Sequence, residues 1–402
     1  MTALLNETIE KGLYAKIDAY EPEMIDEITK LVAIPSLATS VNEEGLTCGP
    51  EITRCLHYAL KLAERLGFKT HNEDDLFGWA EIGEEGPLVA MFLHMDIVPV
   101  GENWTKEPFI VSREGDYLYG RGVLDNKGPA VSVLYAIKSC LDLGVKFPYR
   151  LRVYFGTTEE TGMDDVQVYI KRYGAPDYSF VPDSQFPLSY SEVNTASFQL
   201  RKNYDPSKIV SPIRLVDVDY VDHPNGVAMY ASCTLECDSE ELAVSTAENA
   251  KAFADENGFI FTVERSERKV KVSAKGRISD HWDDLWTGVP AIGELVMFLD
   301  TVSLGKEPDE YIHFIAEKIG MKWDGSGLGI EDKRDSGTLA MGMSSIELNE
   351  FGLNIGFFTI FSAELRNEFM FNGIFRKTRP ENIDVVVTSM GAGFIRDKND
   401  PF

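Results

Sequence analysis

The sequence lacks any long apolar run, and its opening residues lack an export signal. No stretch approaches the ~20 consecutive apolar residues that a membrane-spanning helix needs. In the opening MTALLNETIEKGLYAK, the charged side chains of Glu7, Glu10 and Lys11 interrupt the apolar ones, which excludes a signal-peptide core. We therefore expect a protein that stays in the cytoplasm and does not bind membranes.

Basic residues are scarce relative to acidic ones. The chain has 39 Lys and Arg against 65 Asp and Glu, so its formal net charge is −26. A field of this sign repels the phosphates of nucleic acids and of anionic lipids. A dinucleotide site also lacks support, because no Gly-x-Gly-x-x-Gly follows an expected strand. We therefore expect no nucleic-acid partner and no organic cofactor.

Cysteine is sparse, and its spacing fits no disulfide framework or zinc finger. The five cysteines are an odd number, which fits a reducing compartment. Alternation along MYASCTLEC places Cys233 and Cys237 on the same face of an expected strand. A disulfide between them is an alternative, but two free thiols in the core are the expectation.

What the chain does have is length and regular apolar patterning. At 402 residues it exceeds one ordinary core, so we expect two domains, and a hydrophobic content of 44% argues against disorder. Apolar periodicity predicts helices over residues 21–33, 50–66, 129–143 and 162–173. Short apolar or alternating runs predict strands over residues 68–72, 77–82, 87–93, 151–155 and 177–181, with a hairpin around residues 114–116.

His94 and Asp96 follow the apolar run LVAMFL, at the expected carboxyl end of a buried strand. Open α/β sheets collect their active sites at such ends. In an extended chain Asp96 points to the same face as His94 and can accept its second ring N–H, which fixes the tautomer behind a metal ligand. A lone strand-end histidine beside a turn aspartate is the alternative.

Three further acidic segments also follow expected strands. GRGVLDNKGPA carries Asp125, either as a ligand or as the N-cap of the next helix. GTTEETG carries Glu159 and Glu160, which either divide metal binding and proton transfer or only favour a helix dipole. VPDSQFP carries Asp183, as a ligand or a turn residue. One histidine with several carboxylates is the donor set expected for zinc or manganese.

The four segments HMD, GRGxxDNKGP, GTTEETG and PDSQFP, in this order, resemble those of a known family. It is the di-zinc metallopeptidase family of acetylornithine deacetylase, succinyl-diaminopimelate desuccinylase, carnosinase and bacterial dipeptidases. The likeness is greatest to the PepV-type (Xaa-His) dipeptidases, over about residues 20–195. It implies an α/β fold, with a zinc-exopeptidase catalytic domain whose mixed sheet is flanked by helices, and an inserted α+β lid domain.

The resemblance implies four ligands for a pair of divalent metal ions. His94 and Asp183 would bind one ion, Glu160 would bind the other, and Asp125 would bridge both. The ions would be zinc, with manganese or cobalt as alternatives. The resemblance also implies a cis peptide bond between Asp125 and Asn126. The remaining histidines, His57, His71, His223 and His313, have no matching motif and are expected to be structural.

Three further residues take catalytic roles in the resemblance. Glu159 would be the general base, and Asp96 would orient His94. In SDHWDDLWTGVPAIGEL, His281 would help to polarise the scissile carbonyl. This segment departs from the family pattern, since Pro290 stands where the helix start usually has asparagine.

The expected domain boundaries also come from the resemblance. Residues 1–188 would form the first part of the catalytic domain, residues 189–386 the lid, and residues 387–402 a truncated return to the catalytic domain. In FMFNGIFRKTRPENI, Ile374 stands near the position of the arginine that holds the substrate carboxylate. Arg376 would replace it only if strand alternation presents its side chain.

Family members continue beyond this point with a glycine-rich segment and a final histidine that completes the second metal site. This chain ends at DKNDPF, and its last histidine is His313. We expect a truncated gene product. A fragment of a longer chain, or a ligand from elsewhere or from a partner chain, are the alternatives.

The function implied is metal-dependent hydrolysis of small dipeptides with a free amino terminus, which the missing histidine would impair. An acidic surface suits small zwitterions better than polyanions. An N-acyl amino acid deacylase with the same metal centre and a catalytically inactive truncated homologue are the alternatives. The sequence leaves monomer and homodimer open.

Overall fold

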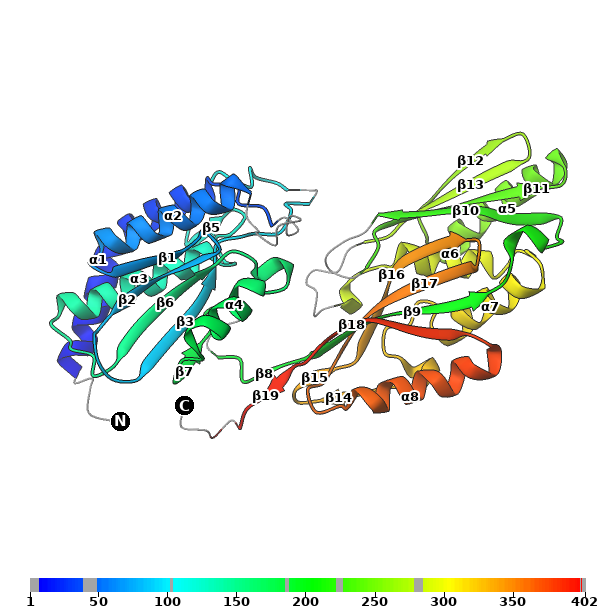
Figure 1. The fold of residues 1–402 in the computed structure, drawn as a ribbon. Coiled ribbons are helices and arrows are strands. Elements are labelled where there is room, and N and C mark those ends of the chain that lie inside the picture. The colour runs from blue at the N-terminus through cyan, green and yellow to red at the C-terminus, as the bar shows by residue number, and fades with distance from the viewer. Residues whose placement is uncertain are drawn as a thin grey trace. The chain divides into compact units, whose positions relative to one another are not determined.

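The computed structural model describes residues 7–38, 49–101, 104–184, 188–221, 227–277, 285–397 and 399. The chain divides into two compact units, Met1–Leu188 and Ser189–Phe402 (Figure 1). Among the described residues, no helix combines the length and apolar character that crossing a bilayer requires.

A five-stranded mixed sheet lies at the centre of the first unit, in the order β1-β2-β6-β3-β7. Strands β6, β3 and β7 run parallel, whereas β2 is antiparallel to β6 and β1 is antiparallel to β2. The predicted strands are therefore present, and so is the predicted hairpin. Their bounds are β1 Lys69–Glu73, β2 Phe77–Ile82, β3 Leu88–His94, β4 Ser112–Glu114, β5 Tyr117–Tyr119, β6 Arg150–Gly156 and β7 Tyr178–Phe180.

Helices cover both faces of this sheet (Figure 1). One face packs against three helices through a continuous apolar core, in which α2 buries the stripe that its sequence predicts. The other face packs against α4, where Tyr169 contacts Trp79 and Tyr154. This arrangement confirms the predicted α/β fold with a mixed sheet flanked by helices. The helices are α1 Glu7–Val32, α2 Pro50–Arg65, α3 Lys127–Asp142 and α4 Asp164–Tyr173.

Helix α1 is longer than predicted, because it begins at Glu7 and continues through Pro22. The ring of Tyr20 packs edge-on against Tyr135 of α3, with 5.2 Å between the ring centroids, and the Tyr20 hydroxyl donates to Asp142. These contacts hold the turn that precedes the proline against α3. Tertiary packing thus overrides the local tendency of proline to end a helix.

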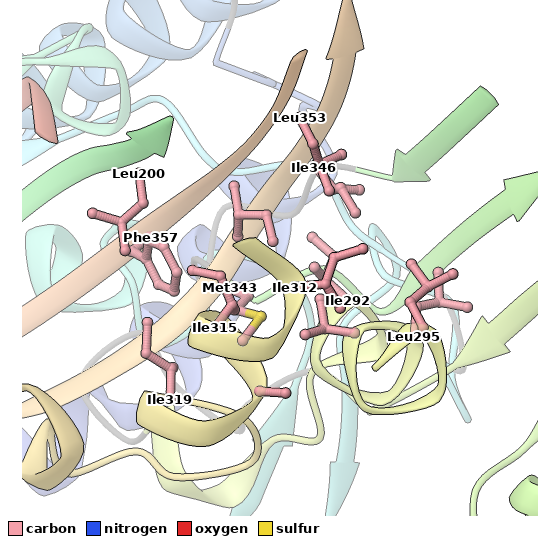
Figure 2. Close-up of a cluster of buried hydrophobic side chains, with 14 of the residues drawn as sticks. Leu200, Ile292, Leu295, Ile312, Ile315, Ile319, Met343, Ile346, Leu353 and Phe357 are labelled. Atoms are coloured by element: carbon pink, nitrogen blue, oxygen red, sulfur yellow. The ribbon is translucent and has the colours of Figure 1, made fainter. Parts of the chain in front are cut away.

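The second unit contains two four-stranded antiparallel sheets, β10-β11-β13-β12 and β16-β17-β9-β18. Its main core lies between these strands and the helices, and Figure 2 shows Ile292 of α6 and Ile315 of α7 near Met343 of β16. The helices are α5 Glu240–Asn257, α6 Ala291–Leu299, α7 Lys306–Lys318 and α8 Asn367–Thr378. The strands are β9 Asn194–Asn203, β10 Ile213–Val221, β11 Tyr230–Cys237, β12 Phe261–Ser266, β13 Lys269–Lys275, β16 Ala340–Asn349, β17 Gly352–Phe361 and β18 Asp384–Gly391, with short pairs β14 Lys333–Arg334 and β15 Gly337–Thr338, and β8 Ser191–Glu192 and β19 Phe394–Ile395.

The segment that was expected to present Arg376 from a strand is a helix, α8. Its apolar residues Met370, Phe371 and Ile374 recur at helical spacing and are buried, which leaves Arg376 exposed. The strand interpretation was therefore wrong.

Two strands lie at the predicted return to the catalytic domain. Strand β18 runs across residue 386 and pairs with β9, and β19 pairs with β8. The assignment of residues 387–402 to a catalytic domain stays a prediction.

Candidate metal centre

Three parallel strands bring the predicted ligands to one edge of the sheet in the first unit. His94 is the last residue of β3, Glu159 and Glu160 follow β6, and Asp183 follows β7. Because β3 lies between β6 and β7 and runs parallel to both, all three carboxyl ends meet at the same edge. The local sequence therefore determines the strands, and the parallel pairing places their polar ends together.

His94 is 1% exposed, and its two ring nitrogens have different partners. Nδ1 lies 2.8 Å from the main-chain oxygen of Asp96 and 3.3 Å from its Oδ1. Because a carbonyl oxygen only accepts, Nδ1 carries a proton and Nε2 faces the carboxylates. The carboxylate of Asp96 was predicted as the acceptor, but the nearer acceptor is the main-chain carbonyl of the same residue.

Asp125 and Asp183 converge on Nε2 of His94. The distances from Nε2 are 2.9 Å to Asp125 Oδ1 and 3.3 Å to Asp183 Oδ2. The Asp125–Asn126 peptide bond is cis, as the resemblance implied. The N-cap alternative for Asp125 is wrong, because Asn126 occupies the N-cap position of α3.

Glu159 and Glu160 lie in a short 3-10 turn, Glu159–Thr161, directly after β6. Oε2 of Glu159 is 4.0 Å from Nε2 of His94. The main-chain N–H of Glu160 donates to Asp96 Oδ2 at 3.1 Å, so Asp96 joins the histidine and the glutamate turn. Buried Asp165 accepts from the Thr157 main-chain N–H at 2.7 Å and holds the start of this turn.

The pKa values of these groups reflect burial and the excess of carboxylates. Burial, reinforced by neighbouring carboxylates, raises the pKa of Glu159 to about 7 and that of Glu160 to about 8. Burial lowers the pKa of His94, but hydrogen bonds with Asp125, Asp183 and Asp96 outweigh it and raise this pKa well above its ordinary value. A cation in the site would relieve the repulsion among the carboxylates.

The donor atoms fit a divalent metal ion. His94, Asp125 and Asp183 each offer one atom within 4.8 Å of the others, and so do His94, Glu159 and Glu160. Oε1 of Glu160 is buried and has no hydrogen-bond partner among the described residues. A bound cation would give this buried oxygen the partner that it lacks. Imidazole nitrogen with carboxylate oxygens suits zinc and manganese.

The other histidines have different partners or lie outside the described residues. His281 and His223 belong to segments that the structure does not describe. His57 pairs with an aspartate at 2.6 Å, His71 stacks on Trp79 with centroids 4.0 Å apart, and His313 pairs with an aspartate at 3.0 Å.

Two buried residues that directly follow Asp125 were not predicted as part of the site. Asn126 and Lys127 are both 0% exposed. The Lys127 ammonium donates to the main-chain oxygens of Leu31, in the last turn of α1, at 3.1 Å and of Ile34, just beyond that helix, at 2.7 Å. The available signal was a pair of polar residues at the start of an otherwise apolar helix.

An imidazole and several carboxylates at the carboxyl edge of a mixed sheet are the features of an α/β metallohydrolase. The comparisons with known proteins narrow this class. Residues 90–274 match the sequence model described as "Peptidase family M20/M25/M40". Residues 90–274 are thus similar to the peptidases of this family, and the chain is a hydrolase that acts on peptide bonds.

Curated relatives match along nearly the whole chain. Proteins of Staphylococcus haemolyticus and Staphylococcus aureus, both named "Putative dipeptidase", are 25% and 26% identical over 398 residues. Each match covers 96% of this chain and 83% of the relative.

Solved structures share the fold. Human carnosine dipeptidase 1 has a TM-score of 0.54 at 15% identity, and the match covers 98% of this chain and 83% of that chain. The dipeptidase Dug1p of Saccharomyces cerevisiae has a TM-score of 0.52 at 14% identity, with 97% and 81% covered. At these identities the likeness shows the fold alone.

Proposed function

We propose that this chain is a metal-dependent dipeptidase that hydrolyses small dipeptides with a free amino terminus. The observation that carries the proposal is the convergence of Asp125, Asp183 and Glu159 on Nε2 of the buried His94. The dipeptidase names of the staphylococcal relatives support a peptide substrate of this size.

In this proposal four side chains hold two divalent ions, with zinc favoured over manganese and cobalt. The converging donor atoms and the unpartnered Oε1 of Glu160 support it. When bound, such ions supply Lewis acidity that polarises a carbonyl and lowers the pKa of water towards about 7. The proposed ligands are His94, Asp125, Glu160 and Asp183.

Glu159 is the proposed general base. Its side chain is 33% exposed, so water reaches it, and its Oε2 lies 4.0 Å from Nε2 of His94. A carboxylate beside a metal-bound water can accept a proton from that water and release it again. It takes the proton of the attacking water as the new C–O bond forms, and it returns that proton to the amine as the C–N bond breaks.

Asp96 and His281 have the remaining proposed roles. Asp96 fixes the proton on Nδ1 of His94 through its main-chain oxygen and connects to the glutamate turn through Oδ2. His281 would polarise the scissile carbonyl, and its alanine variant should lower kcat without releasing metal. A cytoplasmic location, supported by the free cysteines Cys55, Cys140, Cys233 and Cys237, completes the proposal.

The test combines metal analysis with substrate assays on the full chain. Two bound equivalents of zinc, manganese or cobalt, with hydrolysis of a dipeptide, support the proposal. Hydrolysis of an N-acetyl amino acid instead identifies a deacylase with the same centre. One equivalent or none, without turnover of either substrate, identifies a catalytically inactive homologue.

A further inference from the structure

The side chain of Asn126 connects two proposed ligands that are far apart in the sequence. Its Oδ1 accepts the main-chain N–H of His94 at 3.3 Å. Its Nδ2 donates to the main-chain oxygen of Pro182 at 3.0 Å and to Asp183 Oδ1 at 2.6 Å. The amide therefore joins the end of β3 to the turn after β7, directly beside Asp125.

The polarity of these partners allows only one orientation of the amide. The N–H of His94 only donates, so it must face the carbonyl oxygen of Asn126. The oxygen of Pro182 only accepts, so it must face the NH₂ group. Because Asn126 is 0% exposed, solvent water does not compete with these two partners in the folded state. The main chains of His94 and Pro182 therefore fix the orientation of the amide, and this orientation directs its NH₂ group to Asp183.

The two carboxylate oxygens of Asp183 consequently have different roles. Oδ1 is held by Asn126, whereas Oδ2 lies 3.3 Å from Nε2 of His94. Rotation of the Asp183 carboxylate would break its short bond to Asn126. Only Oδ2 is then directed towards the space between His94 and Asp125.

We propose that Asn126 is a positioning residue that fixes Asp183 as a one-oxygen metal ligand and thereby sets the affinity for the ion held by His94, Asp125 and Asp183. This inference rests on the proposed metal centre. Residues that orient metal ligands by hydrogen bonds contribute strongly to affinity without touching the metal.

Asn194 in the second unit provides a matched control. It is 7% exposed, and its Nδ2 donates to the main-chain oxygens of Ser362 at 2.7 Å and Leu365 at 3.3 Å. Its Oδ1 accepts the main-chain N–H of Gly393 at 2.9 Å. Asn194 thus makes as many hydrogen bonds as Asn126, but none to a proposed ligand.

The experiment measures zinc affinity by competition with a chromophoric chelator, using the full chain with its metal removed. Asn126→Ala should weaken binding at one site about 10- to 100-fold. Asn194→Ala should lower the melting temperature but change the zinc affinity less than twofold. Asn126→Leu, which is nearly isosteric, serves as a second variant if the alanine variant does not fold.

A double-mutant cycle tests whether Asn126 acts through Asp183. In an Asp183→Ala background, adding Asn126→Ala should change the affinity little, because the ligand that it orients is gone. Equal zinc affinity in wild type and Asn126→Ala, or equal losses in Asn126→Ala and Asn194→Ala, would overturn the inference alone. A wild-type chain that binds no zinc, manganese or cobalt would instead overturn the metal centre, and the inference with it.

Discussion

At the scale of single residues, two adjacent glutamates have different environments. Glu160 is tied to Asp96 through its main chain, and its Oε1 is buried without a partner among the described residues. Glu159 is partly exposed and lies 4.0 Å from the ring of His94. The buried, unpartnered oxygen of Glu160 suits a metal ligand, and the partly exposed carboxylate of Glu159 suits a group that carries protons. Substitution of each glutamate should therefore affect metal binding and catalysis differently.

Glu159→Gln should lower kcat about 10²- to 10⁴-fold with metal content unchanged, because an amide cannot accept the proton of water. Glu160→Gln should release metal, because a neutral amide is a poorer ligand. Steady-state kinetics and elemental analysis of both variants check this. Equal loss of metal in the two variants would contradict the assignment.

Glu294 of α6 should make the free energy of unfolding depend on pH. It is 3% exposed, and burial raises its pKa to about 7. Because the folded-state pKa is higher than that of the unfolded chain, the stability contribution is present below about pH 4 and is lost as pH rises through 7. Glu294→Gln should therefore be about 2–3 kcal/mol more stable than wild type at pH 8 and no more stable at pH 4.

Urea denaturation at both pH values measures this difference. Glu248→Gln, at an exposed position of α5, is the control and should change stability by less than about 0.5 kcal/mol at either pH. An advantage of Glu294→Gln that is the same at pH 4 and pH 8 would show that charge is not its cause.

Residue types at strand ends were enough to indicate the cluster, but not every contact within it. His94, Asp125 and Asp183 converge because each follows a strand or turn that local patterning predicts. The side-chain role of Asn126 depends on Pro182, 56 residues away, and no local periodicity encodes such a contact. Likewise, alternation placed Asp96 near His94 but did not distinguish its carbonyl from its carboxylate.

At the scale of elements, Lys127 attaches the start of α3 to the end of α1. Lys127→Met would leave the main-chain oxygens of Leu31 and Ile34 without this donor. We expect a loss of about 1–3 kcal/mol in the free energy of unfolding, measured by urea denaturation without metal. Lys138→Met removes a lysine of the same helix that forms a surface pair with Asp142, and should cost less than about 1 kcal/mol.

The elements with strong periodicity were predictable, whereas those that depend on tertiary packing were not. The amphipathic stripe of α2 and the apolar run of β3 both lie where predicted. The part of α1 before Pro22 includes Tyr20, which packs on Tyr135 of α3, and a local pattern interrupted by Pro22 does not show this contact. The α8 segment was misassigned because a short apolar run fits both strand and helix.

At the scale of the whole molecule, the two units have separate cores, and the proposed ligands all belong to the first. A ligand that binds only the folded state stabilises the unit that holds its site. Zinc or manganese should therefore raise the melting temperature of one calorimetric transition and leave the other within about 1 °C. At a free metal concentration 100-fold above the dissociation constant, the gain is about 2.7 kcal/mol.

Differential scanning calorimetry with metal and with chelator measures these transitions. In Asp125→Asn, which has lost a proposed ligand, the metal-dependent rise should be small. An equal rise in both transitions would indicate nonspecific binding to the acidic surface, which a charge of −26 makes a necessary control.

The parallel pairing of β3 with β6 and β7 also determines where this chain tolerates changes in length. Successive side chains of a strand point to opposite faces of the sheet. One residue inserted within β3 would therefore turn the imidazole of His94 away from its carboxylate partners. The same insertion in a connecting loop would leave the pairing intact. Natural length variation among homologues should therefore concentrate in the crossovers and spare the three strands.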